Sequence, residues 1–208
     1  MMFQLIKKDI VFNLKWALLL ALTAVGMPLA LAFDREETRL ILWVYIIGNM
    51  LANSFLVSKS CYLDDNAPTR RFLASLPVRR TQLVASKYLL AFLCIVASLA
   101  LSSLSALALG LRPSVQGALI AAMYLLLYYA VFLGVFFHSN YSNAEKAHTS
   151  LILLTVMSAF VIDRSGVRLD ELAINTAMLL GGLGVCALIC AASAFLSIRP
   201  LLKEKPCS

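Results

Sequence analysis

The sequence predicts an all-α membrane protein that crosses the bilayer with six transmembrane helices. The first observation is that 61% of its 208 residues are hydrophobic, whereas soluble domains are about 45–50% apolar. The second is that these residues form six long runs, and the third is that the charged residues all lie between the runs. Little chain is left over for a soluble domain, so residues 1–208 are expected to form a single transmembrane domain.

The six runs contain no Asp, Glu, Lys, Arg or His. They are Trp16–Phe33, Leu40–Val57, Tyr88–Leu111, Val115–Phe137, Thr149–Ile162 and Leu172–Ile198. Five of them have the roughly 20 residues that a spanning helix needs. The run Thr149–Ile162 is shorter, and it spans only if its helix begins near Glu145; the alternative is a re-entrant segment. All six are rich in Leu and Ala and do not alternate, which favours helices over strands.

Basic residues are shared unequally between the two sides of this predicted bundle. The N-terminal segment, the second and fourth loops and the C-terminal tail hold 13 Lys and Arg, and the other three loops hold five. Cytoplasmic loops carry the excess of Lys and Arg. Both termini and the long second loop, Ser58–Lys87, are therefore predicted to be cytoplasmic. This distribution accounts for the net charge of +7 without a nucleic-acid partner.

The N-terminal segment allows two interpretations. In residues 1–15, Phe3, Ile6, Ile10 and Leu14 fall on one helical face, which predicts a helix lying in the membrane interface ahead of the first span. Alternatively, residues 1–33 act as a signal peptide that is cleaved after a small-x-small site ending at residue 32.

The sequence indicates neither an enzyme nor a metal site. No Gly is followed by Lys, so a phosphate-binding P-loop is absent. His138 and His148 are ten residues apart and the five cysteines form no CxxC pair, which argues against zinc. The runs carry no ionisable residue, and this disfavours transport driven by an ion gradient. Energy for any transport is expected to come from another subunit.

A few polar residues inside the runs are candidates for lining a substrate path. They are Asn49, Asn53, Ser54, Asn175 and Thr176. The alternative is that these residues hydrogen-bond neighbouring helices, as polar side chains in membranes commonly do.

The second loop contains a predicted short helix. Thr69 can cap a helix that starts at Arg70, and Pro77 ends it. Its apolar side consists of Phe72, Leu73 and Leu76. A further helix is expected to begin near Arg80–Thr81 and to continue into the third span. A short helix held just below the bilayer is an element that a soluble partner can push or pull.

This loop resembles the signature of the small type-two ABC-transporter permeases, which include bacterial exporters of phenol-soluble modulins and antimicrobial peptides. The matching residues are Asp64-Asp65, Phe72-Leu73-Ala74-Ser75-Leu76-Pro77-Val78, Arg80, Val84 and Ser86-Lys87-Tyr88. Arg79 departs from the family pattern, in which Ser or Thr is commoner. The family's layout of six spans, cytoplasmic termini and a signature in the second loop agrees with the prediction above.

The resemblance implies a subunit of an ATP-driven exporter in the bacterial plasma membrane. Two permease chains, identical or related, would pair and rest on two ABC ATPase subunits. Those subunits would bind ATP and Mg²⁺, while this chain would hold no cofactor. The helix around Asp64–Ser75 would couple to the ATPase, and the substrate would be hydrophobic or amphipathic. The residues implied in coupling are Asp64, Asp65, Arg70, Arg71, Phe72, Leu73 and Leu76.

Two alternatives stay open. Arg70 and Arg71 have a second interpretation as anchors to lipid headgroups. The whole chain could also be the substrate-binding membrane subunit of a vitamin importer that borrows an ATPase, for which Ala17 and Ala21 would provide a close helix contact.

Overall fold

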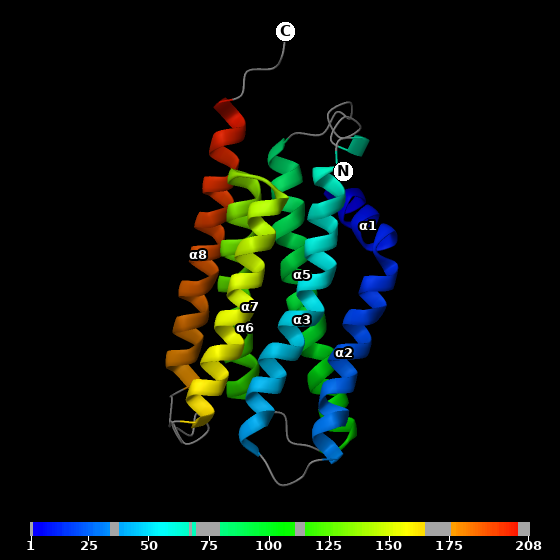
Figure 1. The fold of residues 1–208 in the computed structure, drawn as a ribbon, viewed down its shortest axis with the longest axis vertical. Helices are drawn as coiled ribbons and strands as arrows, with labels where there is room; N and C mark the ends of the chain where they lie inside the picture. Colours follow the sequence, from blue (N-terminus) through cyan, green and yellow to red (C-terminus); the bar gives the residue numbers. More distant parts are fainter. Residues whose placement is uncertain are drawn as a thin grey trace.

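The computed structural model describes residues 2–33, 38–66, 68–69, 80–110, 115–164 and 176–203. Helices account for nearly all of these residues, and no strand occurs among them, which confirms the all-α class for this part of the chain. Figure 1 shows most of the helices side by side along one long axis, with α1 set at an angle at one end. Their bounds are α1 Met2–Phe12, α2 Leu14–Phe33, α3 Thr38–Asp65, α5 Arg80–Ala108, α6 Val115–His138, α7 Tyr141–Arg164 and α8 Thr176–Lys203.

Each predicted apolar run lies in a helix of its own, apart from a few residues at the run ends. Among the described helices, α5, α6 and α8 are long and apolar enough to cross a membrane, and a fourth span results if α1 and α2 form one bent span. The description therefore supports three to four spans, and six stays a prediction. Helix α7 runs unbroken for 24 residues from Tyr141, but it is not among the helices named above, so whether Thr149–Ile162 spans the membrane stays a prediction.

One end of the bundle holds the ion pairs that the described parts of α1, α3 and α5 form with one another. Figure 1 places the start of α1, the end of α3, the start of α5 and the end of α8 at this end. We call it the charged end, because Lys8, Asp9, Asp64 and Lys87 form ion pairs there. The first and last described helices thus have their outer ends on the same side of the bundle, as the distribution of basic residues predicts. Which side of a membrane this is stays a prediction.

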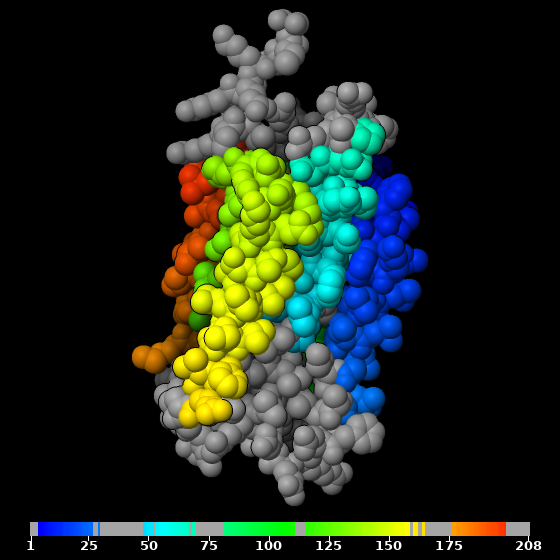
Figure 2. Space-filling view, viewed as in Figure 1, coloured from blue at the N-terminus to red at the C-terminus, as the bar shows by residue number. Residues whose placement is uncertain are grey.

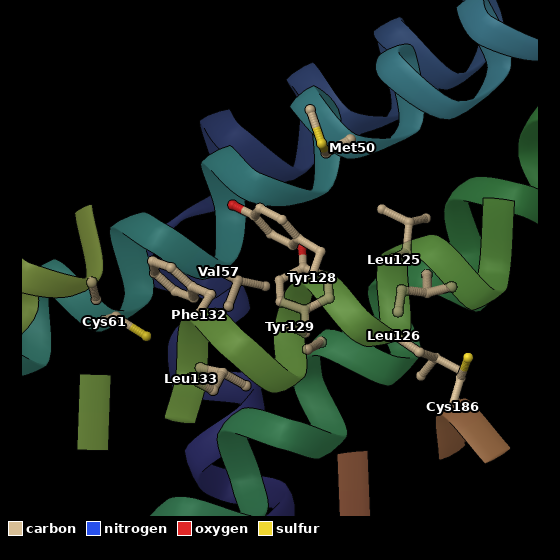
Figure 3. Close-up of a cluster of buried hydrophobic side chains, with 13 residues drawn as sticks. Met50, Val57, Cys61, Leu125, Leu126, Tyr128, Tyr129, Phe132, Leu133 and Cys186 are labelled. Atoms are coloured by element: carbon tan, nitrogen blue, oxygen red, sulfur yellow. The ribbon is translucent and has the colours of Figure 1, made fainter. Parts of the chain in front are cut away.

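Helix α6 provides the centre of the main core, because it packs against α3, α5, α7 and α8. Its aromatic side chains Tyr129 and Phe132 are almost fully buried. Figure 3 shows side chains of α6 gathered with Met50 and Val57 of α3 and with Cys186 of α8. Because lipid tails are as apolar as Leu, such close packing, rather than removal from water, holds membrane helices together.

Helices α6 and α8 approach closely where small residues face each other. A Cβ atom built on Gly134 would lie 3.0 Å from Ser193 Oγ, and one on Gly182 would lie 2.6 Å from Met123 Cε. Ser193 Oγ also donates a hydrogen bond of 2.7 Å to the Ala130 carbonyl of α6. The glycine-rich stretch of α8 is therefore partly a packing surface for α6.

The turn between α1 and α2 is built around Asn13. The two helices meet at 78°. The Asn13 side chain donates to the Asp9 carbonyl at 2.9 Å, and the Asn13 carbonyl accepts from the Trp16 and Ala17 amides at 2.8 and 3.0 Å. Asn13 thus satisfies backbone groups at the end of one helix and at the start of the next.

The predicted apolar face of α1 is divided by this packing. Ile6 is buried in a second cluster with Leu20, Leu56, Leu90 and Cys94, whereas Ile10 and Leu14 are exposed. The Phe3 side chain lies outside the described residues. Exposed apolar residues on α1 are compatible with the predicted interfacial helix, whose position relative to a membrane stays a prediction.

The outer helices expose apolar side chains. Figure 2 shows α7 across the front of the bundle, with α8 and α2 at opposite edges. On α8, Met178, Val185 and Leu188 are all exposed. Exposed apolar side chains on the outer helices fit contact with lipid or with another membrane helix.

Candidate coupling site at the charged end

Four charged side chains form a closed ring of ion pairs at the charged end. Lys87 Nζ lies 2.9 Å from Asp9 Oδ2 and 2.5 Å from Asp64 Oδ2. Lys8 Nζ lies 3.3 Å from Asp9 Oδ1 and 3.0 Å from Asp64 Oδ1. The ring joins three helices, because α1 contributes Lys8 and Asp9, α3 contributes Asp64 and α5 contributes Lys87. Its two positive and two negative charges balance.

The ring is buried on three of its four corners. The side chains of Lys87, Asp9 and Asp64 are 1%, 4% and 6% exposed, and that of Lys8 is 26% exposed. Burying an unpaired charge is very costly, so each buried charge needs a partner of opposite sign. Here every charge has two such partners, which makes the whole arrangement tolerable inside the protein.

Ser60 of α3 supplies the remaining contacts of Lys87. Lys87 Nζ donates to the Ser60 carbonyl at 3.3 Å and also to the Ser60 hydroxyl. A lysine ammonium has three N–H donors, and Asp9 Oδ2 and the two Ser60 oxygens accept all three. Asp64 Oδ2 is held by the ion pair alone. Lys87 is therefore fixed in position by α1 and α3 together.

The burial of Lys87 is a feature that the count of basic residues in the sequence does not show. Lys87 counts there as one of 13 basic residues in cytoplasmic segments, and it stands directly before the apolar run that begins at Tyr88. The structure places Lys87 inside the protein, where its ammonium group forms ion pairs with Asp9 and Asp64. The runs themselves hold no ionisable residue, but a fully buried one lies immediately beside the third run.

The two acids implied in coupling also make contacts within the chain. Asp64 belongs to the ring, and Asp65 Oδ2 accepts a hydrogen bond of 3.3 Å from the amide of Tyr141, the first residue of α7. A carboxylate is favourable there because the first turn of a helix has unpaired N–H groups. The Tyr141 hydroxyl also lies 2.9 Å from Ser58 Oγ. The last turns of α3 are thus tied to α7 as well as to α1 and α5.

The predicted loop Ser58–Lys87 is helical at both of its ends. Helix α3 continues through Ser58 to Asp65, and α5 begins at Arg80, as the sequence predicts for the second helix. The other residues implied in coupling lie outside the described residues: Arg70, Arg71, Phe72, Leu73 and Leu76. Their role stays a prediction, as does contact of Asp64 and Asp65 with an ATPase.

The candidate lining residues of α3 lie inside the bundle. Asn49, Asn53 and Ser54 are at most 2% exposed. Asn53 Nδ2 donates to Ser98 Oγ of α5 at 2.8 Å and to the Asn49 carbonyl at 2.7 Å. This geometry supports the alternative interpretation, in which these residues join neighbouring helices. Thr176 is exposed at the start of α8, and Asn175 lies outside the described residues.

A shallow apolar groove lies between α5, α6 and α8. It has a volume of about 170 Å³, and its lining includes Ala187, Cys190 and Ala191 of α8 and Tyr88 and Phe92 of α5. Its walls offer hardly any polar groups. Within the described ranges, no group of three His, Cys, Asp or Glu residues is placed to hold a metal ion.

Sequence reasoning missed Asp9 and Lys8. A signal was present, because Asp9 is the only acidic residue in the first 33 positions. A lone acid in a segment expected at the membrane needs a cationic partner. The sequence does not reveal which lysine serves, since Lys87 is 78 positions away.

A comparison with protein-family models supplies the family. The model for the ABC-2 family transporter proteins matches residues 4–201, a range that includes the whole ring, α3, α5 and most of α8. Comparisons with curated proteins and with solved structures gave no significant match. Because the family match covers nearly the entire sequence, the chain belongs to the ABC-2 family of transporter permeases and is a membrane-embedded, multi-pass protein.

Proposed function

We propose that the chain is the transmembrane permease subunit of an ATP-driven exporter in the plasma membrane of a bacterium. Permeases of the ABC-2 family normally pair with an ABC ATPase. ATP and Mg²⁺ would bind to that separate subunit, since no Gly-Lys step of a P-loop occurs in this sequence. A second permease chain, identical or related, would complete the gate.

The observation that carries the proposal is the joining of α3 and α5 at one end of the bundle. Asp64 and Lys87 lie on either side of the segment that includes residues 70–76, and their charged atoms are 2.5 Å apart. Because α3 and α5 are joined on either side of residues 70–76, a force applied to these residues acts on both helices. This arrangement suits a segment on which an ATPase acts.

The proposed substrate is hydrophobic or amphipathic, such as an antimicrobial peptide, and it moves outward. The apolar groove beside α8 and the exposed apolar residues of that helix support this chemistry. The outward direction rests on the resemblance of the second loop to exporter permeases. For Asn49, Asn53 and Ser54 to line the path, α3 and α5 would have to separate, because these side chains are buried between them.

The test replaces Arg70, Arg71 and Phe72 together by Ala in the chain co-expressed with the ATPase subunit of its own transporter. The variant is expected to insert and to unfold like the wild type, but to retain the ATPase at least about tenfold less well, since a few central contacts dominate such interfaces. ATPase co-purification and ATP turnover are measured. Unchanged values for both would show that the coupling assignment is wrong.

A matched control is Arg164→Ala, which removes an exposed arginine from the last turn of α7, at the opposite end of the bundle. This variant should keep ATPase binding and turnover. The vitamin-importer alternative has its own test: tight binding of a vitamin by the purified chain alone would overturn export.

A further inference from the structure

The ring of ion pairs also includes α1, which is distant in sequence from residues 70–76. We call residues 70–76 the coupling segment, because they include five of the seven residues implied in coupling. Asp64 precedes that segment and Lys87 follows it, whereas Asp9 belongs to α1. Lys87 Nζ reaches Asp9 and Asp64 at the same time, at 2.9 and 2.5 Å. One ammonium group therefore connects the start of α5 with both α3 and α1.

We propose that Lys87 is a positioning residue for coupling, which holds the end of α3, the start of α5 and helix α1 together as one rigid body. A displacement delivered to the segment between α3 and α5 then turns α1 along with them. The inference rests on the proposed function for the source of the displacement. The rigid body itself does not depend on an ATPase.

The burial of the ring makes it resist partial opening. If Lys87 moved away, Asp9 and Asp64 would be left buried with Lys8 as their shared partner, and such an excess of buried charge is costly. The three helices are also packed at this point, since Ile6 of α1 and Leu90 of α5 share one buried cluster with Leu56 of α3. Separate movement of any one helix would disturb both the charges and this packing.

Helix α1 can pass a rotation on to α2. The backbone and side-chain bonds of Asn13 join the two helices directly at their 78° bend. Helix α2 in turn packs against α3 and α5 along the bundle. The bend thus converts a tilt of α1 at the charged end into a movement of a long helix in the membrane region.

The decisive comparison separates two roles of Lys87: holding the three helices together and balancing the buried charges of the carboxylates. Lys87→Met leaves two buried carboxylates against Lys8 and should destabilise the protein. Adding Asp9→Asn leaves the Lys8–Asp64 pair, which is neutral and still connects α1 with α3. The double variant Lys87→Met/Asp9→Asn should therefore regain most of the melting temperature, while α5 lacks its ion pairs to the other two helices. Lys7→Met, which removes an exposed lysine of α1, is the control for loss of a positive charge.

The first readout is hydrogen exchange of the full chain in lipid nanodiscs. In the double variant, amides of residues 84–91 should exchange at least about tenfold faster than in the wild type, while those of α1 and of residues 58–65 keep wild-type rates. If residues 84–91 also returned to wild-type rates, the ring would serve only charge balance and the proposal would be overturned. Lys7→Met should match the wild type throughout.

The second readout is ATP turnover with the ATPase subunit of the same transporter. The double variant should bind the ATPase normally but lose its effect on turnover, despite its recovered melting temperature. Normal turnover with faster exchange would overturn the role of Lys87 in coupling. Failure of the ATPase to bind even the wild-type chain would instead refute the proposed function, and the exchange data would still report on the rigid body.

Discussion

Lys87 Nζ lies 2.5 Å from Asp64 Oδ2, so a buried ion pair joins the last turn of α3 to the first part of α5. The two residues flank residues 70–76, which include five of the seven residues that the family resemblance implies in coupling. Because Lys8 pairs with the same carboxylate at 3.0 Å, Asp64 is the acid of α3 that forms ion pairs with both α1 and α5.

Replacing Asp64 by Asn should destabilise the protein strongly. The change leaves Lys8 and Lys87 to share Asp9, and breaking a buried ion pair by removing one partner typically costs about 3–5 kcal/mol. Reversible unfolding in mixed detergent micelles measures the loss. Glu145→Gln removes an exposed acid of α7 and should change stability by less than about 0.5 kcal/mol. Equal effects of the two variants would contradict the importance of the ring.

The hydrogen bond between Asn53 and Ser98 should appear as a coupling energy in a double-mutant cycle. Asn53→Ala and Ser98→Ala each remove one side of a buried contact of 2.8 Å between α3 and α5, so the second change should cost less once the first has been made. Coupling energies of such bonds in membranes average about 0.6 kcal/mol, with a maximum of about 1.7 kcal/mol.

The control for this cycle pairs Asn53→Ala with Ser105→Ala. Ser105 donates within its own helix, to the Ser102 carbonyl at 3.0 Å, so these two changes should be additive. If the Asn53 and Ser98 changes were additive as well, and if they altered transport without altering stability, a lining role would be favoured over packing.

Two glycines should respond in opposite directions to replacement by Ala. At Gly134 the new Cβ would lie 3.0 Å from Ser193 Oγ, which the Ala130 carbonyl and the Tyr88 hydroxyl hold in place. Overpacking of this kind costs about 1–3 kcal/mol. At Gly184 the Cβ would meet no atom within 4 Å, so Ala should gain up to about 1 kcal/mol from helix propensity.

Thermal unfolding of the two glycine variants in one detergent tests this prediction. The melting temperature should fall for Gly134→Ala and rise or stay constant for Gly184→Ala. A fall of similar size in both would contradict the open space around Gly184 and the difference in packing between the two sites.

The positions of the helices follow from the apolar runs, but the helix ends do not. Hydropathy stops at Val57, yet α3 continues to Asp65 because Val57, Cys61 and Asp64 are buried along one helical face. Helix α7 likewise begins at Tyr141, ahead of Thr149, across turns that carry Glu145 and Lys146. Amphipathic turns at the ends of membrane helices look like loops when only hydrophobicity is counted.

The candidate site was predictable only in part. Asp64 and Lys87 belong to the recognised signature, but the sequence does not show that they pair with each other and with Asp9. Such pairing depends on how α1 packs, and no local periodicity encodes it. The buried amides Asn49 and Asn53 posed a different problem, because the same side chains suit a polar channel and a hydrogen bond between helices.

A closed ring also constrains how this chain can change over generations. Since each of its four charges pairs with two of the others, we expect a substitution at position 8, 9, 64 or 87 to be tolerated better when a second one restores the charge balance. Relatives that lack the ring are expected to have lost a positive and a negative residue together. A chimaera could take α1 from one relative and α5 from another. It would be left with unpaired buried charges if the two parents carried different charges at the ring positions, even though each parent is stable on its own.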